Sequence, residues 1–276
     1  MKRIVTLTFV LLIFVQTHTA DIIFELGGIL LRPNKAKATW HLGPCALAKY
    51  QCCCGDPQEL PEKFFSILHS IHFDGLQPNM EQSCYEGQVC PDIMAAWYRN
   101  DLTCGQSLTH VVKAIESKIA DENTRLLLTR IAQMTFNPDD HIKIMEPTDK
   151  ALSLLDACKK QLHRKTKQTK HRLFVVANAN SAIGKKLLEK KDLKALFSHF
   201  EDVVFSGDLQ CNKPNPNIFT YLQEKHCLQF ENSYYIDTES LHLEQAKTLG
   251  LNTIHAEKEN LDSVRKELIR LKLIKE

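Results

Sequence analysis

The second half of the sequence alternates short apolar segments with amphipathic ones, and this alternation limits the possible folds more than any other feature. Four apolar runs are short enough to be strands, at residues 173–176, 203–205, 234–236 and 253–254. The flanking segments repeat apolar residues at helical spacing, at 149–162, 183–188, 217–224, 241–249 and 261–273. Apolar strands that alternate with amphipathic helices are typical of a parallel sheet covered by helices on both faces. The sequence therefore predicts an α/β fold.

A further strand is expected far upstream, at residues 21–24, directly before a turn signal at Glu25–Gly28. The long segment that follows, 36–147, has a different character: it is rich in Cys and His and is interrupted by prolines. Its clearest helical patterns span residues 62–71 and 108–134. We therefore expect a core formed by residues 21–35 and 148–276, with a mainly helical block at 36–147 inserted after the first strand.

The first twenty residues have the layout of a secretory signal peptide. Lys2 and Arg3 precede an apolar stretch at 4–15, and a short polar segment ends at Ala20. The apolar stretch is shorter than the roughly 20 residues that span a bilayer. Removal of residues 1–20 would give an exported protein, periplasmic or secreted, without an integral membrane span. The alternatives are a retained membrane anchor and an additional β-strand.

The cysteines are concentrated in the inserted block. Seven of the ten lie between residues 45 and 104, namely Cys45, Cys52, Cys53, Cys54, Cys84, Cys90 and Cys104. An even number of clustered cysteines behind an export signal favours disulfides in an oxidising compartment. Free buried thiols are the alternative. A structural metal is disfavoured because the paired C-x-x-C spacing of zinc sites is missing.

The charge balance argues against a nucleic-acid partner. Thirty-five Lys and Arg residues against 33 Asp and Glu residues give a net charge of +2. One basic stretch stands out, because residues 159–172 hold seven Lys or Arg in fourteen positions. It is either a solvated helix end with its loop or a contact for an acidic surface.

Chemically useful groups follow the expected strands. Glu25 follows the first strand, Asn178 the second, Lys213 the third, and Asp237 ends the fourth. The carboxyl ends of parallel strands meet at one edge of a sheet, where functional groups gather. Two carboxylates that converge repel each other, and Mg²⁺ with its preference for hard oxygen ligands relieves this repulsion. A lysine beside them can hold a carboxylate or a phosphoryl oxygen. The alternative is that both acids are ordinary loop residues.

The amino-acid sequences around these groups are more specific than the spacing between them. Segments 22–30, 175–180, 205–219 and 235–250 resemble, in this order, the four motifs of haloacid dehalogenase-like hydrolases. The K-P-x-P-x-I-F run that starts at Lys213 is the most distinctive part. The resemblance implies a Rossmann-like core with a cap inserted after the first strand. It also implies Mg²⁺-dependent hydrolysis of a small phosphorylated substrate through an aspartyl-phosphate.

The resemblance assigns roles residue by residue. Glu25 stands at the position of the aspartate nucleophile, and Lys213 matches the lysine that neutralises transition-state charge. Asn178 matches the second motif. The predicted catalytic residues are therefore Glu25, Lys213 and Asn178. The predicted Mg²⁺ ligands are Glu25, the backbone carbonyl of Gly27, and Asp237.

Several positions depart from the family pattern. Glutamate at position 25 sets its carboxylate one methylene further from the backbone, a displacement of about 1 Å that can cost on the order of 100-fold in rate. Ala177 replaces the Ser or Thr that contacts the phosphoryl group, and loss of such a donor can cost about 100-fold or more. Thr238 and His242 stand where relatives have an Asp and an Asn. Together these changes predict weak or lost phosphoryl transfer.

Two hypotheses of different classes follow. The first is a hydrolase of small phosphorylated substrates whose turnover is weak or lost. The second is an exported, catalytically inactive binding protein that meets a protein partner through its cap. Dehalogenation is disfavoured because it also requires the aspartate. In the cap, Trp40, Trp97 and Tyr98 are candidates for a substrate entrance or for the cap's own core.

Overall fold

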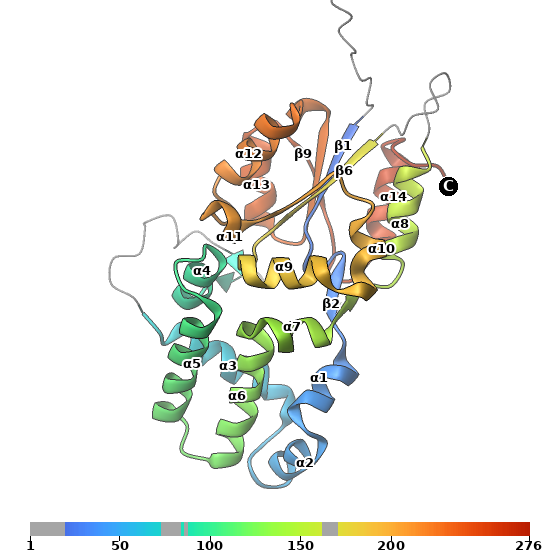
Figure 1. The fold of residues 1–276 in the computed structure, drawn as a ribbon. Helices are drawn as coiled ribbons and strands as arrows, with labels where there is room; N and C mark the ends of the chain where they lie inside the picture. The colour runs from blue at the N-terminus through green and yellow to red at the C-terminus, as the bar shows by residue number, and fades with distance from the viewer. Residues whose placement is uncertain (1–19, 73–83, 86–87, 162–170) are drawn as a thin grey trace, which may run out of the picture.

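Five parallel strands form the central sheet, in the spatial order β7, β6, β1, β8 and β9 (Figure 1). The structure is a computed structural model that describes residues 20–72, 84–85, 88–161 and 171–276. The strands are β1 (Ala20–Phe24), β6 (His171–Ala177), β7 (Asp202–Phe205), β8 (Ser233–Asp237) and β9 (Asn252–His255). The predicted α/β class with a parallel sheet is confirmed.

Helices cover both faces of this sheet, and the alternation of side chains along the strands explains why. Ile23 and Phe174 belong to the apolar cluster shared with α12 and α13, whereas Ile22 and Leu173 belong to the cluster shared with α8, α9 and α14. Figure 1 shows the two helical layers on opposite sides of β1 and β6. Because both faces are buried, the strands are apolar throughout, which is the pattern visible in the sequence.

Five core helices fall close to their predicted positions. They are α8 (Ala151–Lys159), α9 (Ser181–Glu189), α12 (Asn217–His226), α13 (Ser240–Thr248) and α14 (Leu261–Arg270). Two short helices were not predicted, namely α10 (Lys194–Phe197) and α11 (Ser206–Leu209). Short 3₁₀ turns cover Lys191–Leu193 and Phe230–Asn232. Asn180 and Asn260 cap α9 and α14 by accepting backbone N–H bonds.

The inserted block is a helical cap on the carboxyl end of the sheet (Figure 1). Its helices are α1 (Lys35–Leu42), α2 (Pro44–Cys53), α3 (Leu60–His69), α4 (Asp92–Tyr98), α5 (Cys104–Lys118), α6 (Glu122–Phe136) and α7 (Pro138–Ile144). A 3₁₀ turn at Pro57–Glu59 and a short pair of strands, β3 (Cys84–Tyr85) and β4 (Gln88–Val89), complete it. The chain enters through β2 (Leu31–Pro33) and leaves through its antiparallel partner β5 (Met145–Pro147).

The single helical pattern expected over residues 108–134 is wrong, because two helices share it. Helix α5 ends at Lys118 and α6 begins at Glu122. Asp121 caps α6 by accepting a 2.6 Å bond from the backbone N–H of Thr124. Both helices present apolar faces to the same cap core, so the helical spacing of apolar residues continues on either side of the break.

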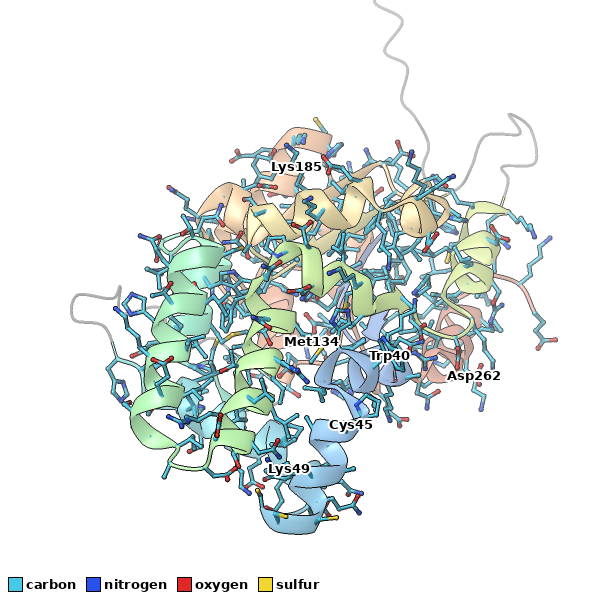
Figure 2. The ribbon with its side chains drawn as sticks, turned by 60° about the horizontal axis from the view of Figure 1, so that its bottom comes forward. Trp40, Cys45, Lys49, Met134, Lys185 and Asp262 are labelled. Atoms are coloured by element: carbon cyan, nitrogen blue, oxygen red, sulfur yellow. The ribbon has the colours of Figure 1, made fainter. Side chains whose placement is uncertain are left out.

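The expected disulfides are not found between the cysteines that the structure describes. Nine are free thiols, namely Cys45, Cys52, Cys53, Cys54, Cys90, Cys104, Cys158, Cys211 and Cys227. The side chain of Cys84 lies outside the described part. Cys45 is exposed on α2, where Figure 2 shows it near Lys49. Cys158 is buried instead, and burial raises the pKa of its thiol to about 12.

Two sequence predictions fall largely outside the described residues. Of the expected leader at 1–20, only Ala20 is described, as the buried first residue of β1. Most of the basic stretch lies at 162–170, also outside. Its last residue, Arg172, donates to both carboxylate oxygens of Asp21 at 2.7 and 2.8 Å, so this charge is paired inside the core. Among the described helices, none has the length and apolar character needed to cross a membrane.

Candidate active site

Three of the predicted site residues come together at the carboxyl edge of the sheet. β1 and β8 are neighbours, and the N–H of Glu25 donates to the carbonyl of Ile236 at 2.9 Å, so Glu25 and Asp237 emerge side by side. The chain order reverses between these strands, which is where ligands bind in open α/β sheets. Lys213 lies between the acids: its Nζ donates to the Glu25 carboxylate and to Oδ2 of Asp237 at 3.0 Å.

The side chain of Asn178 holds the backbone of Lys213 in place. The side-chain oxygen of Asn178 accepts from the N–H of Lys213 at 2.8 Å, and its amide nitrogen donates to the Lys213 carbonyl at 3.2 Å. Both bonds fix the loop that follows α11 relative to the end of β6. Asn178 is thus placed as a positioning residue for Lys213, while the catalytic role that the sequence assigned to it stays a prediction.

The carboxylate of Asp237 is buried, and both of its oxygens accept hydrogen bonds. Its Oδ2 accepts bonds from Lys213, from the hydroxyl of Tyr235, and from Nδ1 of His242 at 3.0 Å. Its Oδ1 accepts from the N–H of Glu239 at 3.0 Å. Burial acts to raise the pKa of Asp237, but the ammonium of Lys213 and the hydrogen bond from His242 outweigh it and hold the pKa below its ordinary value. Asp237 is therefore ionised at neutral pH.

Sequence reasoning missed Tyr235, and it noted His242 only as a departure from the family pattern. Tyr235 lies two residues before Asp237 on β8, so the alternation of side chains along a strand places both on one face and would have identified it. Its hydroxyl also accepts from Nζ of Lys213 at 2.8 Å. Burial raises the pKa of Tyr235 and lowers that of His242, so Tyr235 keeps its proton and His242 is neutral. Nε2 of His242 has no hydrogen-bond partner among the described residues.

The carboxylate of Glu25 turns back onto its own loop. Its Oε1 accepts from the backbone N–H groups of Leu26 at 2.8 Å and Gly27 at 2.9 Å. Its Oε2 accepts from Lys213. Two amides and one ammonium group surround the position of this carboxylate, which is an arrangement suited to an anion. In this protein the anion at that point is the Glu25 side chain itself.

Hydrogen bonds already occupy much of the capacity that these residues could offer to Mg²⁺. Ligand atoms of Glu25, Asp237 and His242 lie within 4.8 Å of one another, close enough to share one ion. Mg²⁺ requires an octahedron of mainly oxygen ligands with free lone pairs. Oδ2 of Asp237 already accepts three bonds and Oε1 of Glu25 accepts two. Lys213 supplies the positive charge between the carboxylates that a metal ion would otherwise supply.

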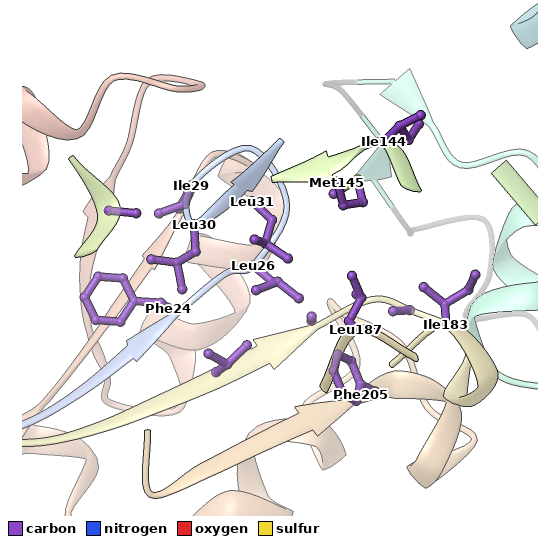
Figure 3. Close-up of a cluster of buried hydrophobic side chains, with 14 of the residues drawn as sticks. Phe24, Leu26, Ile29, Leu30, Leu31, Ile144, Met145, Ile183, Leu187 and Phe205 are labelled. Atoms are coloured by element: carbon purple, nitrogen blue, oxygen red, sulfur yellow. The ribbon is translucent and has the colours of Figure 1, made fainter. Parts of the chain in front are cut away.

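A cavity of about 310 Å³ opens between the cap and the core, next to Glu25. We refer to it as the cap–core cavity. Figure 3 shows part of its wall, with Leu26, Met145, Ile183 and Leu187 gathered beyond the end of β1. The other described residues that line it are Glu25, Gly27, Leu31, Pro33, Met94, Trp97, Tyr98, Ile131, Met134, Thr135, His141, Ile144, Ala177, Asn178 and Ala179.

The lining of the cap–core cavity shows the position of residues whose roles the sequence left undecided. Ala177 lines it with a methyl group where relatives carry a hydroxyl. Trp97 and Tyr98 line it from α4, although Trp97 is also buried in the apolar core of the cap. Trp40 is 76% exposed on α1 and is not among the lining residues.

Known structures share this architecture. A HAD family enzyme from Bacteroides thetaiotaomicron is 14% identical, with a TM-score of 0.53 over 88% of this chain and 96% of that chain. A HAD-like family hydrolase from Porphyromonas gingivalis is 17% identical, with a TM-score of 0.51 over 91% and 98%. A HAD-hydrolase from Bacillus subtilis, solved with magnesium, is 16% identical, with a TM-score of 0.52 over 86% and 87%. These likenesses show the fold.

The sequence itself also matches a known family. No curated protein is similar to the chain. A sequence model described as haloacid dehalogenase-like hydrolase, however, matches residues 102–256, which is more than half of the chain. This range includes the segments that carry Asn178, Lys213 and Asp237. The chain belongs to the haloacid dehalogenase-like hydrolase family.

Proposed function

We propose that this chain is a haloacid dehalogenase-like hydrolase of phosphomonoesterase ancestry whose phosphoryl transfer is weak or lost. The observation that carries the proposal is the position of the Glu25 carboxylate, which accepts bonds from Leu26, Gly27 and Lys213. Those donors are the ones that would neutralise a phosphoryl group at this edge of the sheet. A phosphate ester has to displace the Glu25 side chain before it can use them.

The chemistry that remains supports the same proposal. A carboxylate that accepts hydrogen bonds from three N–H groups is a poorer nucleophile than a free one, because those bonds stabilise its negative charge. The phosphoryl group also loses a hydroxyl donor at Ala177. Lys213 contacts Glu25, and Asn178 binds the backbone of Lys213, which supports residual turnover over a complete loss of the site.

Magnesium is part of this proposal. The Bacteroides enzyme has been solved in complex with magnesium and inorganic phosphate, and the Bacillus hydrolase with magnesium. These structures support Mg²⁺ as the family cofactor, which stabilises charge on the phosphoryl group when bound. In this chain Glu25, the carbonyl of Gly27 and Asp237 would hold it, in competition with the bonds that the two carboxylates accept from Lys213. We therefore propose that Mg²⁺ binds weakly.

The second candidate function is that of an exported binding protein without catalysis. The cap–core cavity favours it, because a ligand site persists beside the altered catalytic groups. The proposal of export rests on the layout of residues 1–20. We also propose that a protein partner contacts the cap. The mass of the protein recovered from its native source, before and after reduction and alkylation, reports both whether the leader is removed and how many disulfides are present.

Aryl-phosphate hydrolysis tests the proposal. Purified protein with Mg²⁺ is expected to hydrolyse p-nitrophenyl phosphate slowly, and Glu25→Asp is expected to raise the rate by up to about 100-fold, because the shorter carboxylate restores the attack distance. Glu231→Asp is the matched control: it makes the same chemical change on an exposed acid in the turn before β8. Robust wild-type turnover that Glu25→Gln abolishes would overturn the proposal of weak or lost transfer.

A further inference from the structure

The wall of the cap–core cavity is suited to a ligand without charge. Most of the described lining residues are aliphatic, aromatic or sulfur-containing, with Trp97, Ile131 and Leu187 contributed by α4, α6 and α9. None of the described lining residues is Lys or Arg. The family likeness would lead one to expect a phosphorylated substrate here, yet the wall offers no cation to receive it.

The polar groups in the wall point the same way. Glu25 is the one described acid in the lining, and its charge is already compensated by Lys213. His141 is held by its Nδ1 contact of 3.1 Å to the carbonyl of Met134. Burial lowers the pKa of His141, so its ring is neutral near pH 7. An anionic ligand would therefore meet a carboxylate whose counter-charge, Lys213, is already engaged, and no lining residue would supply a further cation, which costs binding free energy.

We propose that the cap–core cavity binds a small uncharged apolar molecule of aromatic or aliphatic character. This inference rests on the proposed function, because it takes the phosphoryl position to be filled by Glu25. A volume of about 310 Å³ lies at the lower end of the roughly 300–1,000 Å³ typical of small-molecule sites. Thr135, His141 and Asn178 are the polar lining groups that could orient one hydroxyl or carbonyl of such a ligand.

The two tryptophans provide a direct measurement. Trp97 lies in the cavity wall and is 3% exposed, whereas Trp40 is 76% exposed on α1. Figure 2 shows Trp40 on α1, outside the cavity lining, and Met134, which lines the cavity together with Trp97, on α6. Because the chain has only these two tryptophans, Trp40→Phe leaves Trp97 as the sole donor for energy transfer. The probe is N-phenyl-1-naphthylamine, which is uncharged and absorbs where tryptophan emits. Saturable transfer from Trp97 to the probe is expected.

A substitution within the cavity shows where the probe binds. Ile131→Phe, made in the Trp40→Phe background, adds bulk to the wall from α6 and is expected to weaken probe binding at least about tenfold. Leu126→Phe is the matched control, because Leu126 lies on the same helix and is 42% exposed. Circular dichroism verifies that both variants are folded. Equal probe binding by the two variants would overturn the assignment to this cavity.

Competition separates the neutral ligand from the phosphorylated one. 1-Naphthol and 1-naphthyl phosphate share one apolar body and differ by the phosphate. We expect 1-naphthol to displace the probe at a concentration at least tenfold lower than 1-naphthyl phosphate. Equal or stronger displacement by the phosphate, or no saturable transfer from Trp97 at all, would overturn the inference. Rapid release of 1-naphthol from 1-naphthyl phosphate by the wild type would instead contradict the proposed function, and it is measured separately with Mg²⁺ present.

Discussion

Nζ of Lys213 lies 3.0 Å from Oδ2 of Asp237, and neither side chain has any exposed surface. The ammonium group also contacts the hydroxyl of Tyr235 and the carboxylate of Glu25. A buried ion pair is stable only when additional hydrogen bonds satisfy both charges, and these contacts do so. The pair therefore links the ends of the core segments at the carboxyl edge of the sheet. Because the ammonium group is already bound there, the pair also limits the positive charge that the site can offer to a ligand.

Removing the lysine is expected to destabilise the fold strongly. Lys213→Met leaves Asp237 ionised and buried without its main counter-charge, so we expect the free energy of unfolding to fall by about 3–5 kcal/mol. Urea unfolding followed by circular dichroism measures it. Lys159→Met is the matched control, since Lys159 pairs with Glu201 near the surface and its loss is expected to cost about 1 kcal/mol or less. Similar losses for the two variants would show that the buried pair contributes little.

Removing the Glu25 carboxylate is expected to create an anion site. Glu25→Ala frees the N–H groups of Leu26 and Gly27 together with Nζ of Lys213. We expect orthophosphate to bind this variant at least about tenfold more tightly than the wild type, because these donors then require an external anion. Isothermal titration measures both affinities, with Glu231→Ala as the control. Equal phosphate affinity in the wild type would mean that Glu25 does not fill the site.

Acid stability depends in part on Asp202 at the start of β7. Burial acts to raise the pKa of Asp202, but hydrogen bonds from His226 at 2.8 Å and Lys225 at 2.9 Å outweigh it and lower the pKa. A carboxylate with a depressed folded-state pKa stabilises the protein above its unfolded pKa of about 3.9, and this contribution disappears as the pH falls through the folded value.

The corresponding variant is Asp202→Asn. It is expected to be less stable than the wild type at pH 7, and the difference is expected to shrink as the pH falls below about 4, where the wild type also loses its ion pairs. Urea midpoints measured from pH 7 to pH 3 record this convergence. Asp208→Asn is the control, because Asp208 is exposed on α11. A stability difference that stays constant over the whole pH range would contradict the assignment.

Asn180 links the cap to the core, and its removal should loosen both. Its side-chain oxygen accepts from the N–H of Ala182 at 3.0 Å and from the thiol of Cys104 at 3.3 Å, and its amide donates to the carbonyl of Trp97 at 3.0 Å. For Asn180→Ala we expect a loss of about 2 kcal/mol or more, because buried partners are left unpaired in addition to the lost helix cap.

Asn260→Ala is the comparison for Asn180→Ala, since Asn260 caps α14 at a more accessible position and its loss is expected to cost about 1 kcal/mol. Thermal unfolding gives the two stabilities. The emission of Trp97 in the Trp40→Phe background adds a local readout, because Asn180 contacts the Trp97 backbone. An unchanged Trp97 spectrum, together with an equal loss of stability in both variants, would show that Asn180 acts only as a helix cap and does not link the cap to the core.

Much of the fold was predictable because it depends on short-range pattern. The apolar strands and amphipathic helices of the core appear in the structure within a few residues of their predicted bounds. The break between α5 and α6 escaped prediction because apolar spacing continues across it, and only the cap formed by Asp121 marks it. The prediction of disulfides rested on cysteine number, whereas a bond requires two sulfur atoms to meet, and the described cysteines are free.

The sequence by itself determined which groups stand at the strand ends, namely Glu25, Lys213 and Asp237, and that the usual aspartate is missing. Only the tertiary structure decided how these groups pair. Lys213 and Glu25 are 188 positions apart, and their contact depends on strand order and on the loop that Asn178 fixes. The largely apolar wall of the cap–core cavity has the same origin. Periodicity records which face of a segment is buried, but the chemistry of a site depends on which faces the folded chain brings together.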